Sequence, residues 1–379
     1  MVSVSHVPAR RPPRWRIGPL WLSVIVVFLG LLCGRWVMEV RASQQQDFLV
    51  YVNAARALLD GTSLYQERAA LPYTYPPFAA ILFVPFAPLP DLLAELMWFS
   101  GNVTLAIWIT RRLFPAVPWW FTALVLLGAP LARSIYLGQI NLVRFAALLL
   151  DVVWRRWRGT GVLLGAAAAI KVTPAWTALI LLVRRDWAGA ARAVATALAL
   201  TCAAAVLRPA DSRAYWTSYL WDQTRVGGLD YPDNQSVTGL LARLDEHGVP
   251  AQPLRLVAIG VVLALTAVTL WHWRAEPLSV EAVTAVGLAG LLIAPVSWTH
   301  HWLWLVVFVA ILVQHGSFAA ATILAVVLAV EPLLLEGAMH TLPRWSAALA
   351  LSTFTVAGVI ALVYLGRVPR EPTVREDGA

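Results

Sequence analysis

The chain has 379 residues, of which 59% are hydrophobic and only 13% are charged, and its mean hydropathy is +0.69. This composition excludes an ordinary soluble globular protein and indicates a polytopic membrane protein. The formal net charge of +8 is not concentrated in a long basic run, so no nucleic-acid partner is expected, and the two cysteines, Cys33 and Cys202, lie in apolar runs that support no disulfide framework.

The first predicted element is a membrane helix over residues 18–38, which is preceded by four arginines. Its apolar run of about 20 residues is long enough to cross the hydrocarbon core. A cleaved signal peptide is the alternative, but the run is too long and no clear small-residue cleavage site follows it. We therefore expect a retained first helix, with residues 1–17 in the cytoplasm.

A polar segment, residues 44–77, comes next and is expected on the outer side of the membrane. From Asp47 onward, apolar residues recur at helical spacing at Phe48, Tyr51, Ala55, Leu58 and Leu59. This spacing predicts a short helix along the membrane surface with Asp47 at its N-terminal end. Asp47 is then either a cap of this helix or an acidic catalytic group, and the spacing alone leaves both interpretations open.

The polar segment ends in a turn rich in tyrosine and proline, residues 73–77. Aromatic faces beside a polar pocket suit sugar rings or a lipid carrier, although on composition alone interfacial anchoring is the simpler interpretation. The apolar residues 76–88 contain several prolines, so we expect a re-entrant or juxtamembrane segment there and not a full span.

Eleven further apolar runs follow and bring the predicted number of transmembrane helices to about twelve: 91–110, 117–135, 138–154, 160–171, 173–183, 189–207, 254–273, 282–295, 301–314, 318–335 and 346–365. Arginine clusters between them should mark cytoplasmic ends. A topology in which the chain alternates across the membrane, with these clusters inside, places the outer loops at about 39–90 and 208–253. It gives one transmembrane domain over 18–366 and a disordered cytoplasmic tail over 367–379. The runs 160–171 and 173–183 are too short to span singly, and they predict a broken hairpin that lines a cavity.

Three other polar elements fall on the same outer side, at residues 138–141, 171–174 and 297–301. Lys171 is an ionisable group in an apolar context, and Arg133 and Arg144 flank the first element. Charges at membrane depth usually pair or line a functional cavity, so this cluster fits a phosphate-bearing ligand. Snorkelling of the side chains to lipid headgroups is the alternative.

His300 and His301 are adjacent, so they point in different directions and cannot form a two-ligand metal face. Without a nearby cysteine or a His-x-x-x-His spacing, no metal site and no cofactor are expected. A hydrogen-bonding or cationic role towards a phosphate is more economical. Residues 231–236 form a further turn-rich polar patch in the second outer loop.

Six segments together resemble a known family, although each one alone is a weak signal: 47–66, 73–78, 137–143, 161–174, 212–244 and 294–305. In this order they resemble the polyprenyl-phosphate-mannose-dependent alpha-1,2-mannosyltransferases of actinobacteria, which are glycosyltransferase family eighty-seven with the C-class membrane fold. The resemblance extends from about Asp47 to Trp304.

The resemblance implies an inverting reaction on the outer face of the plasma membrane. Mannose moves from polyprenyl-phosphate mannose to a mannose hydroxyl of a glycolipid or lipoglycan. Asp47 matches the general base of the first outer loop, and either His300 or His301 matches a histidine of the later loop. Arg144 is not part of the motif.

The expected substrate-binding residues are Tyr51, Tyr75, Gln139, Asn141, Lys171, Arg225, Asn234, Gln235 and Trp298. A carboxylate suits the base in an inverting transfer. The leaving polyprenyl phosphate is an acceptable anion, so Lys171, Arg225 and one histidine can stabilise it in place of a general acid.

Two rival functions remain open. The first is transfer of another sugar, such as arabinofuranose, from the same carrier, which donor competition would separate. The second is lipid or sugar transport. Against transport, the two halves of the chain do not repeat in hydropathy, and the polar residues gather at one side of the membrane and not at the midplane. An intramembrane protease is not supported, because neither a Gly-x-Ser-x-Gly nor a His-Glu-x-x-His pattern occurs.

Overall fold

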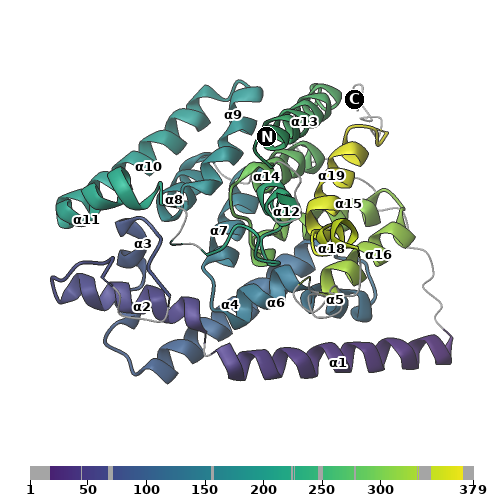
Figure 1. Cartoon of the computed structure of the whole chain (residues 1–379), viewed down its shortest axis with the longest axis horizontal. Coiled ribbons are helices and arrows are strands. Elements are labelled where there is room, and N and C mark those ends of the chain that lie inside the picture. The colour runs from purple at the N-terminus through teal and green to yellow at the C-terminus, as the bar shows by residue number, and fades with distance from the viewer. Residues whose placement is uncertain are drawn as a thin grey trace, which may run out of the picture.

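The computed structural model describes residues 18–43, 45–66, 71–154, 158–222, 225, 227–245, 251–276, 279–330, 332 and 343–369. The predicted cytoplasmic N-terminus, 1–17, and residues 370–379 of the predicted tail lie outside the described residues. Across the described part of the chain the regular structure is helical, with one isolated antiparallel bridge between Asn234 and Trp298 (Figure 1). The predicted all-α class is confirmed.

Within these residues, four helices have the length and apolar composition to cross a membrane: α1 (Pro19–Ser43), α4 (Asp91–Leu113), α10 (Trp187–Leu207) and α13 (Ala251–His272). Only 11% to 22% of the apolar window of each helix is buried inside the protein. Such contiguous exposed apolar surface is typical of a membrane contact. The four correspond to predicted runs, and α1 follows one edge of the molecule in Figure 1.

The other predicted runs form shorter helices, and several of these meet at a break. Gly128 separates α5 (Trp119–Leu126) from α6 (Ala129–Tyr136). Lys171, in an extended conformation, separates α8 (Val162–Ile170) from η3 (Thr173–Ala178) and α9 (Leu179–Val183), as the two half-length runs predicted. Each piece is shorter than the roughly 20 residues that an untilted span needs, so the count of twelve crossings stays a prediction.

The remaining helical elements after α4 are α7 (Asn141–Leu148), η2 (Leu149–Val153), α11 (Pro209–Ala214), η4 (Tyr215–Tyr219), α12 (Val237–Asp245), α14 (Val280–Ile293), η6 (Thr299–His301), α15 (Leu303–Gln314), α16 (Phe318–Ala329), α18 (Arg344–Ala350) and α19 (Thr353–Leu365). The main apolar core surrounds α14 and α15. Every residue from Leu303 to Leu312 is buried, as expected of a helix that is apolar on all sides. η6 immediately precedes this rigid helix and also packs on α6.

A second, smaller core is formed mainly by the helices of the predicted first outer loop. α2 (Gln46–Leu59) packs on α3 (Pro77–Leu82) and η1 (Val84–Phe86). The Phe48 ring stacks on Trp98 with a centroid distance of 5.5 Å, and Phe83 fills the space beside both. The predicted helix after Asp47 is therefore present, with Phe48, Tyr51 and Ala55 buried but Leu59 exposed, and its position along the membrane surface stays a prediction. Residues 76–88 form two short helices and do not make a full span, also as predicted.

Candidate active site

Asp47 lies in the first turn of α2, and the turn that precedes α7 fixes its position. The backbone N–H groups of Asp47 and Phe48 donate to the Leu137 carbonyl oxygen at 3.1 and 3.3 Å. Gly138 follows with φ +70°, and a Cβ placed there would lie 2.5 Å from the Cβ of Phe48. Glycine therefore permits both the backbone conformation and the close approach of α2.

The Asp47 carboxylate does not cap α2. Gln45 occupies the cap position, and Asp47 Oδ2 accepts a hydrogen bond from Gln139 Nε2 at 2.6 Å. The capping interpretation is therefore wrong. Burial raises the pKa of Asp47 to about 6, against the opposing effects of the Gln139 hydrogen bond and the charges of Lys171 and Arg133. A carboxyl group with a pKa near neutrality is well suited to accept a proton.

Gln139 connects Asp47 to two buried tyrosines. The Tyr51 hydroxyl lies 2.9 Å from Gln139 Oε1 and 2.9 Å from the Tyr75 hydroxyl. Tyr73 and Tyr75 are each only 5% exposed, and the Tyr73 hydroxyl donates to the Pro76 carbonyl. Side chains this deeply buried do not anchor the protein at a membrane surface, so interfacial anchoring is wrong for these two tyrosines. They form a wall beside Asp47.

Lys171 lies at the end of α8, where the extended backbone points the chain away from the helix. Its Nζ lies 4.8 Å from the centroid of the Tyr75 ring, a cation–π contact. Burial and then the charge of Arg144 lower the pKa of Lys171 to about 7, against the opposing effect of Asp47. Lys171 and Asp47 therefore lie within electrostatic range of each other, and Lys171 packs on the tyrosine wall.

His300 and His301 of η6 lie side by side, with ring centroids 4.5 Å apart. His301 Nδ1 accepts a hydrogen bond from the Trp298 N–H at 3.1 Å, so the neutral ring carries its proton on Nε2. His300 is 4% exposed, and among the described residues neither of its ring nitrogens has a hydrogen-bond partner. Burial and nearby cations lower the pKa of both histidines well below the usual value, so both rings are neutral.

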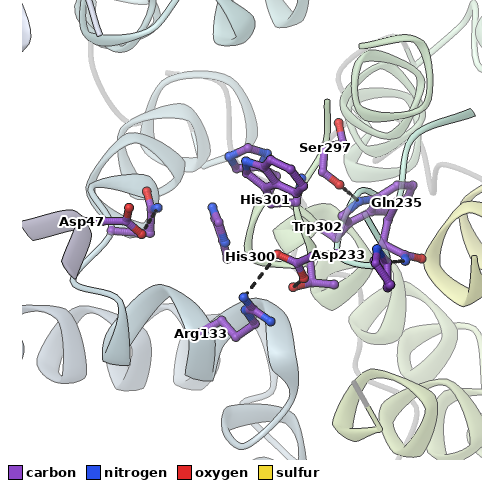
Figure 2. Close-up of polar contacts among 12 residues, drawn as sticks. Asp47, Arg133, Asp233, Gln235, Ser297, His300, His301 and Trp302 are labelled. Atoms are coloured by element: carbon purple, nitrogen blue, oxygen red, sulfur yellow. Dashed lines mark hydrogen bonds and ion pairs between the residues drawn. The ribbon is translucent and has the colours of Figure 1, made fainter. Parts of the chain in front are cut away.

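An ion pair between Arg133 of α6 and Asp233 supports the histidines. Arg133 Nη2 lies 3.2 Å from Asp233 Oδ2, and Thr299 Oγ1 donates to Asp233 Oδ1 at 2.5 Å. Figure 2 shows this pair beside His300, with Asp47 on the other side of the ring. Asp233 therefore holds the predicted second outer loop against η6, and the charge of Arg133 reaches both Asp47 and His300.

Asn234 and Gln235 are fully buried, and their side chains bind other parts of the protein. Asn234 Nδ2 donates to the Leu229 and Pro295 carbonyl oxygens, and its Oδ1 accepts from the Ser297 N–H at 3.0 Å. Gln235 donates to two backbone carbonyl oxygens and accepts from the Phe354 N–H. Asn234 therefore positions the start of the 297–301 segment, whereas the Gln235 side chain holds the chain at Pro232, Leu351 and Phe354. Direct substrate contact of both residues stays a prediction.

The remaining predicted site residues, Asn141, Trp298 and Arg225, lie in different parts of the structure. Asn141 Nδ2 donates to the His300 carbonyl oxygen at 3.2 Å and so lies at the histidines. Trp298 packs against Tyr231, with ring centroids 6.0 Å apart. Arg225 stacks on Tyr219, with its guanidinium carbon 4.5 Å from the ring centroid. Arg225 thus belongs to a tyrosine cluster adjoining the wall, and the structure gives it no contact with Asp47 or the histidines.

The structure therefore brings most of the predicted residues into one site: Asp47, Tyr51, Tyr75, Gln139, Asn141, Lys171, His300 and His301. Sequence reasoning missed Asp233 and its ion pair with Arg133, and it placed Arg133 and Arg144 only in a general cluster of cations for a phosphate-bearing ligand. The signal for the arginines was their charge within apolar runs. The only sequence signal for Asp233 was its place in the polar patch 231–236.

The arrangement is suited to a substitution with an anionic leaving group. The site combines a carboxylate that can accept a proton with a lysine within electrostatic range of it and two neutral histidines. Lys171 can balance negative charge, and the His301 Nε2–H can donate a hydrogen bond to it. Within the described residues, no group of three or more His, Cys, Asp or Glu side chains is placed to hold a metal ion.

Residues 73–295, more than half of the chain, match the sequence model of glycosyltransferase family 87. A polyprenol-phosphate-mannose-dependent alpha-(1-2)-phosphatidylinositol pentamannoside mannosyltransferase of Mycolicibacterium smegmatis is 34% identical over 80% of this chain and 77% of its own. A polyprenol-phosphate-mannose-dependent alpha-(1-2)-phosphatidylinositol mannoside mannosyltransferase of Mycobacterium tuberculosis is also 34% identical, over 76% of this chain and 73% of its own. No solved structure matches significantly. The chain therefore belongs to glycosyltransferase family 87 and is a glycosyltransferase.

Proposed function

We propose that this chain transfers mannose from polyprenyl-phosphate mannose to a mannose hydroxyl of a glycolipid. The names of the mycobacterial relatives supply the donor and a phosphatidylinositol mannoside acceptor. The observation that carries the proposal is the Asp47 carboxylate within electrostatic range of Lys171, in a site that also holds two neutral histidines. That combination provides a base for a sugar hydroxyl and a cation for a departing phosphate.

In the proposed reaction Asp47 accepts the proton of the acceptor hydroxyl while the oxygen of that hydroxyl attacks the anomeric carbon of mannose. The bond from this carbon to the phosphate oxygen breaks, and polyprenyl phosphate leaves with the electron pair. Attack opposite the leaving group inverts the anomeric centre. Lys171 and the His301 Nε2–H stabilise the negative charge on the leaving phosphate, so no acid is required.

Asp47 is held ready for this step by its surroundings. Gln139 orients the carboxylate, and the same amide is held by Tyr51, which fixes its orientation. Asp47 keeps part of its surface exposed, so an acceptor hydroxyl can reach it. A base within hydrogen-bond reach of the substrate proton contributes about 100- to 10,000-fold to the rate of a proton-transfer step.

We place the reaction on the extracytoplasmic face of the plasma membrane, with an alpha-1,2 linkage and a glycolipid or lipoglycan acceptor. The support for the face is the arginine pattern of the sequence, which assigns Asp47, Lys171 and His300 to the same outer side. The support for the linkage is the alpha-(1-2) specificity in the names of the relatives. Asp47, His300 and His301 are the proposed catalytic residues.

The proposal is tested with purified protein in proteoliposomes that contain polyprenyl-phosphate mannose and a phosphatidylinositol mannoside. We expect mannose transfer that Asp47→Asn reduces by about 100-fold or more. Asp60→Asn, at the exposed far end of α2, is the matched control and should remain active. Near-normal transfer by Asp47→Asn rejects the base assignment. Exclusive use of a polyprenyl-phosphate arabinofuranose donor in competition, or flux without transfer, rejects mannose transfer itself.

A further inference from the structure

A pocket opens beside His301, between α7, η3 and α14. Its empty volume is about 620 Å³, which includes open solvent at its mouth. The polar part of its lining consists of Asn141, Arg144, Thr173, Thr177, Ser297 and His301. The rest of the lining is apolar. The pocket therefore has a charged part next to the histidines and a hydrocarbon-like part elsewhere.

Arg144 provides the charge of this pocket. The residue is only 9% exposed, and its Nε and Nη1 atoms have no hydrogen-bond partner in the described part of the chain. An unpaired cation in a low-dielectric interior is strongly unfavourable, which indicates that a ligand supplies the missing negative charge. Arg144 also acts electrostatically on Lys171 and both histidines. Its charge is thus directed at the centre where the sugar is transferred.

Two tryptophans form the apolar walls of the pocket and pack directly on α14. A Cβ added to Gly290 would lie 2.7 Å from Trp176 Cδ1, and one added to Gly287 would overlap the Trp304 indole. Trp176 Nε1 also donates to the Val286 carbonyl oxygen at 3.0 Å, which fixes the ring. The glycines therefore leave room for flat apolar walls, along which a hydrocarbon chain can lie.

We propose that this pocket binds the phosphate and the adjoining isoprene units of a prenyl phosphate, and that Arg144 recognises the phosphate. The inference rests on the proposed function, in which the leaving group is a polyprenyl phosphate. An anionic head and an apolar tail match the two parts of the lining. The phosphate lies at Arg144, within electrostatic range of Lys171, and the His301 Nε2–H donates to it. Guanidinium groups favour phosphate because they can offer two parallel N–H donors.

The test measures binding of farnesyl phosphate and of uncharged farnesol to the purified full-length protein in detergent. We expect Arg144→Gln to weaken farnesyl phosphate binding by about 10- to 100-fold, the range of one charge-assisted hydrogen bond. Farnesol binding should stay unchanged, because the apolar walls are intact. Arg144→Lys should retain part of the phosphate selectivity. Arg111→Gln, an equal change at an exposed arginine, should have no effect.

The outcomes separate this inference from the proposed function, because no sugar transfer enters the measurement. Equal binding of farnesyl phosphate by Arg144→Gln and wild type overturns the phosphate assignment even if mannose transfer is established. If Arg144→Gln weakens farnesol binding as much as farnesyl phosphate binding, Arg144 only supports the fold, and the phosphate assignment is also overturned. Inorganic phosphate and a short-chain phosphatidic acid are tested as competitors, and displacement of farnesyl phosphate by either at equal concentration overturns the preference for a prenyl phosphate.

Discussion

Replacing Gln139 with methionine should move the acid limb of the pH profile of kcat/KM. Gln139 Nε2 donates to Asp47 Oδ2 at 2.6 Å, and this bond opposes the increase in pKa that burial causes. A hydrogen bond to a charged group contributes about 1.5–3 kcal/mol, which is about one to two pKa units. In Gln139→Met the pKa of Asp47 should therefore rise from about 6 to about 7 or higher.

The effect on activity follows from the ionised fraction of Asp47. For a rise from about 6 to about 7, activity falls about fivefold at pH 6 and by only about a tenth at pH 8, beyond any pH-independent loss. Initial rates of mannose transfer measured from pH 5 to pH 9 give this limb. Tyr51→Phe is the control, because it removes the hydroxyl next to Gln139 and leaves the Asp47–Gln139 bond in place. If the acid limb of kcat/KM does not move in Gln139→Met, or if it moves equally in Tyr51→Phe, the Gln139 hydrogen bond does not set the pKa of Asp47.

Two other expectations concern the alkaline limb of the pH profile of kcat/KM and the position of α2. The pKa of Lys171 is lowered to about 7, so its positive charge is present below that pH and is lost above it; kcat/KM should fall above about 7. Lys171→Arg should extend activity to higher pH, and a wild-type alkaline limb in this variant contradicts the assignment. Gly138→Ala should displace Asp47 and strongly reduce kcat, because the new Cβ would meet Phe48. Gly61→Ala, with a similar φ of +72° and open space around it, is the control and should retain kcat; similar kcat values for the two variants would show that the contact with Phe48 does not matter.

Arg133 and Asp233 show how the loop and the membrane region cooperate. Their ion pair joins α6 to the predicted second outer loop, and Thr299 of the histidine segment donates to the same carboxylate. Asn234 fastens the same loop to the backbone at Ser297. Contacts between residues about 160 positions apart along the chain therefore hold the histidine segment in place. The histidine rings held in this way are buried and neutral beside several cations.

The sequence by itself determined the elements that depend on local pattern and composition. Apolar runs specify membrane helices because in lipid a helix satisfies the backbone hydrogen bonds internally. Four helices in the described part of the chain are long and apolar enough to cross a membrane. The spacing after Asp47 specified α2, and the polar interruption at Lys171 specified the break after α8. The resemblance of separate motifs identified the family, which the comparisons confirmed.

Only the tertiary structure decided what the side chains do, because capping, anchoring and ligand binding are differences in contact and not in pattern. Asp47 could cap a helix by its position, yet its carboxylate accepts a hydrogen bond from Gln139 in the turn between α6 and α7. Tyr75 could anchor the protein at an interface, yet it is buried beneath Lys171. Asn234 has the composition of a binding residue, yet its amide is used to hold the chain. Contacts between residues far apart in sequence set burial and pKa, and these two quantities turn a polar segment near the N-terminus into one side of a candidate active site.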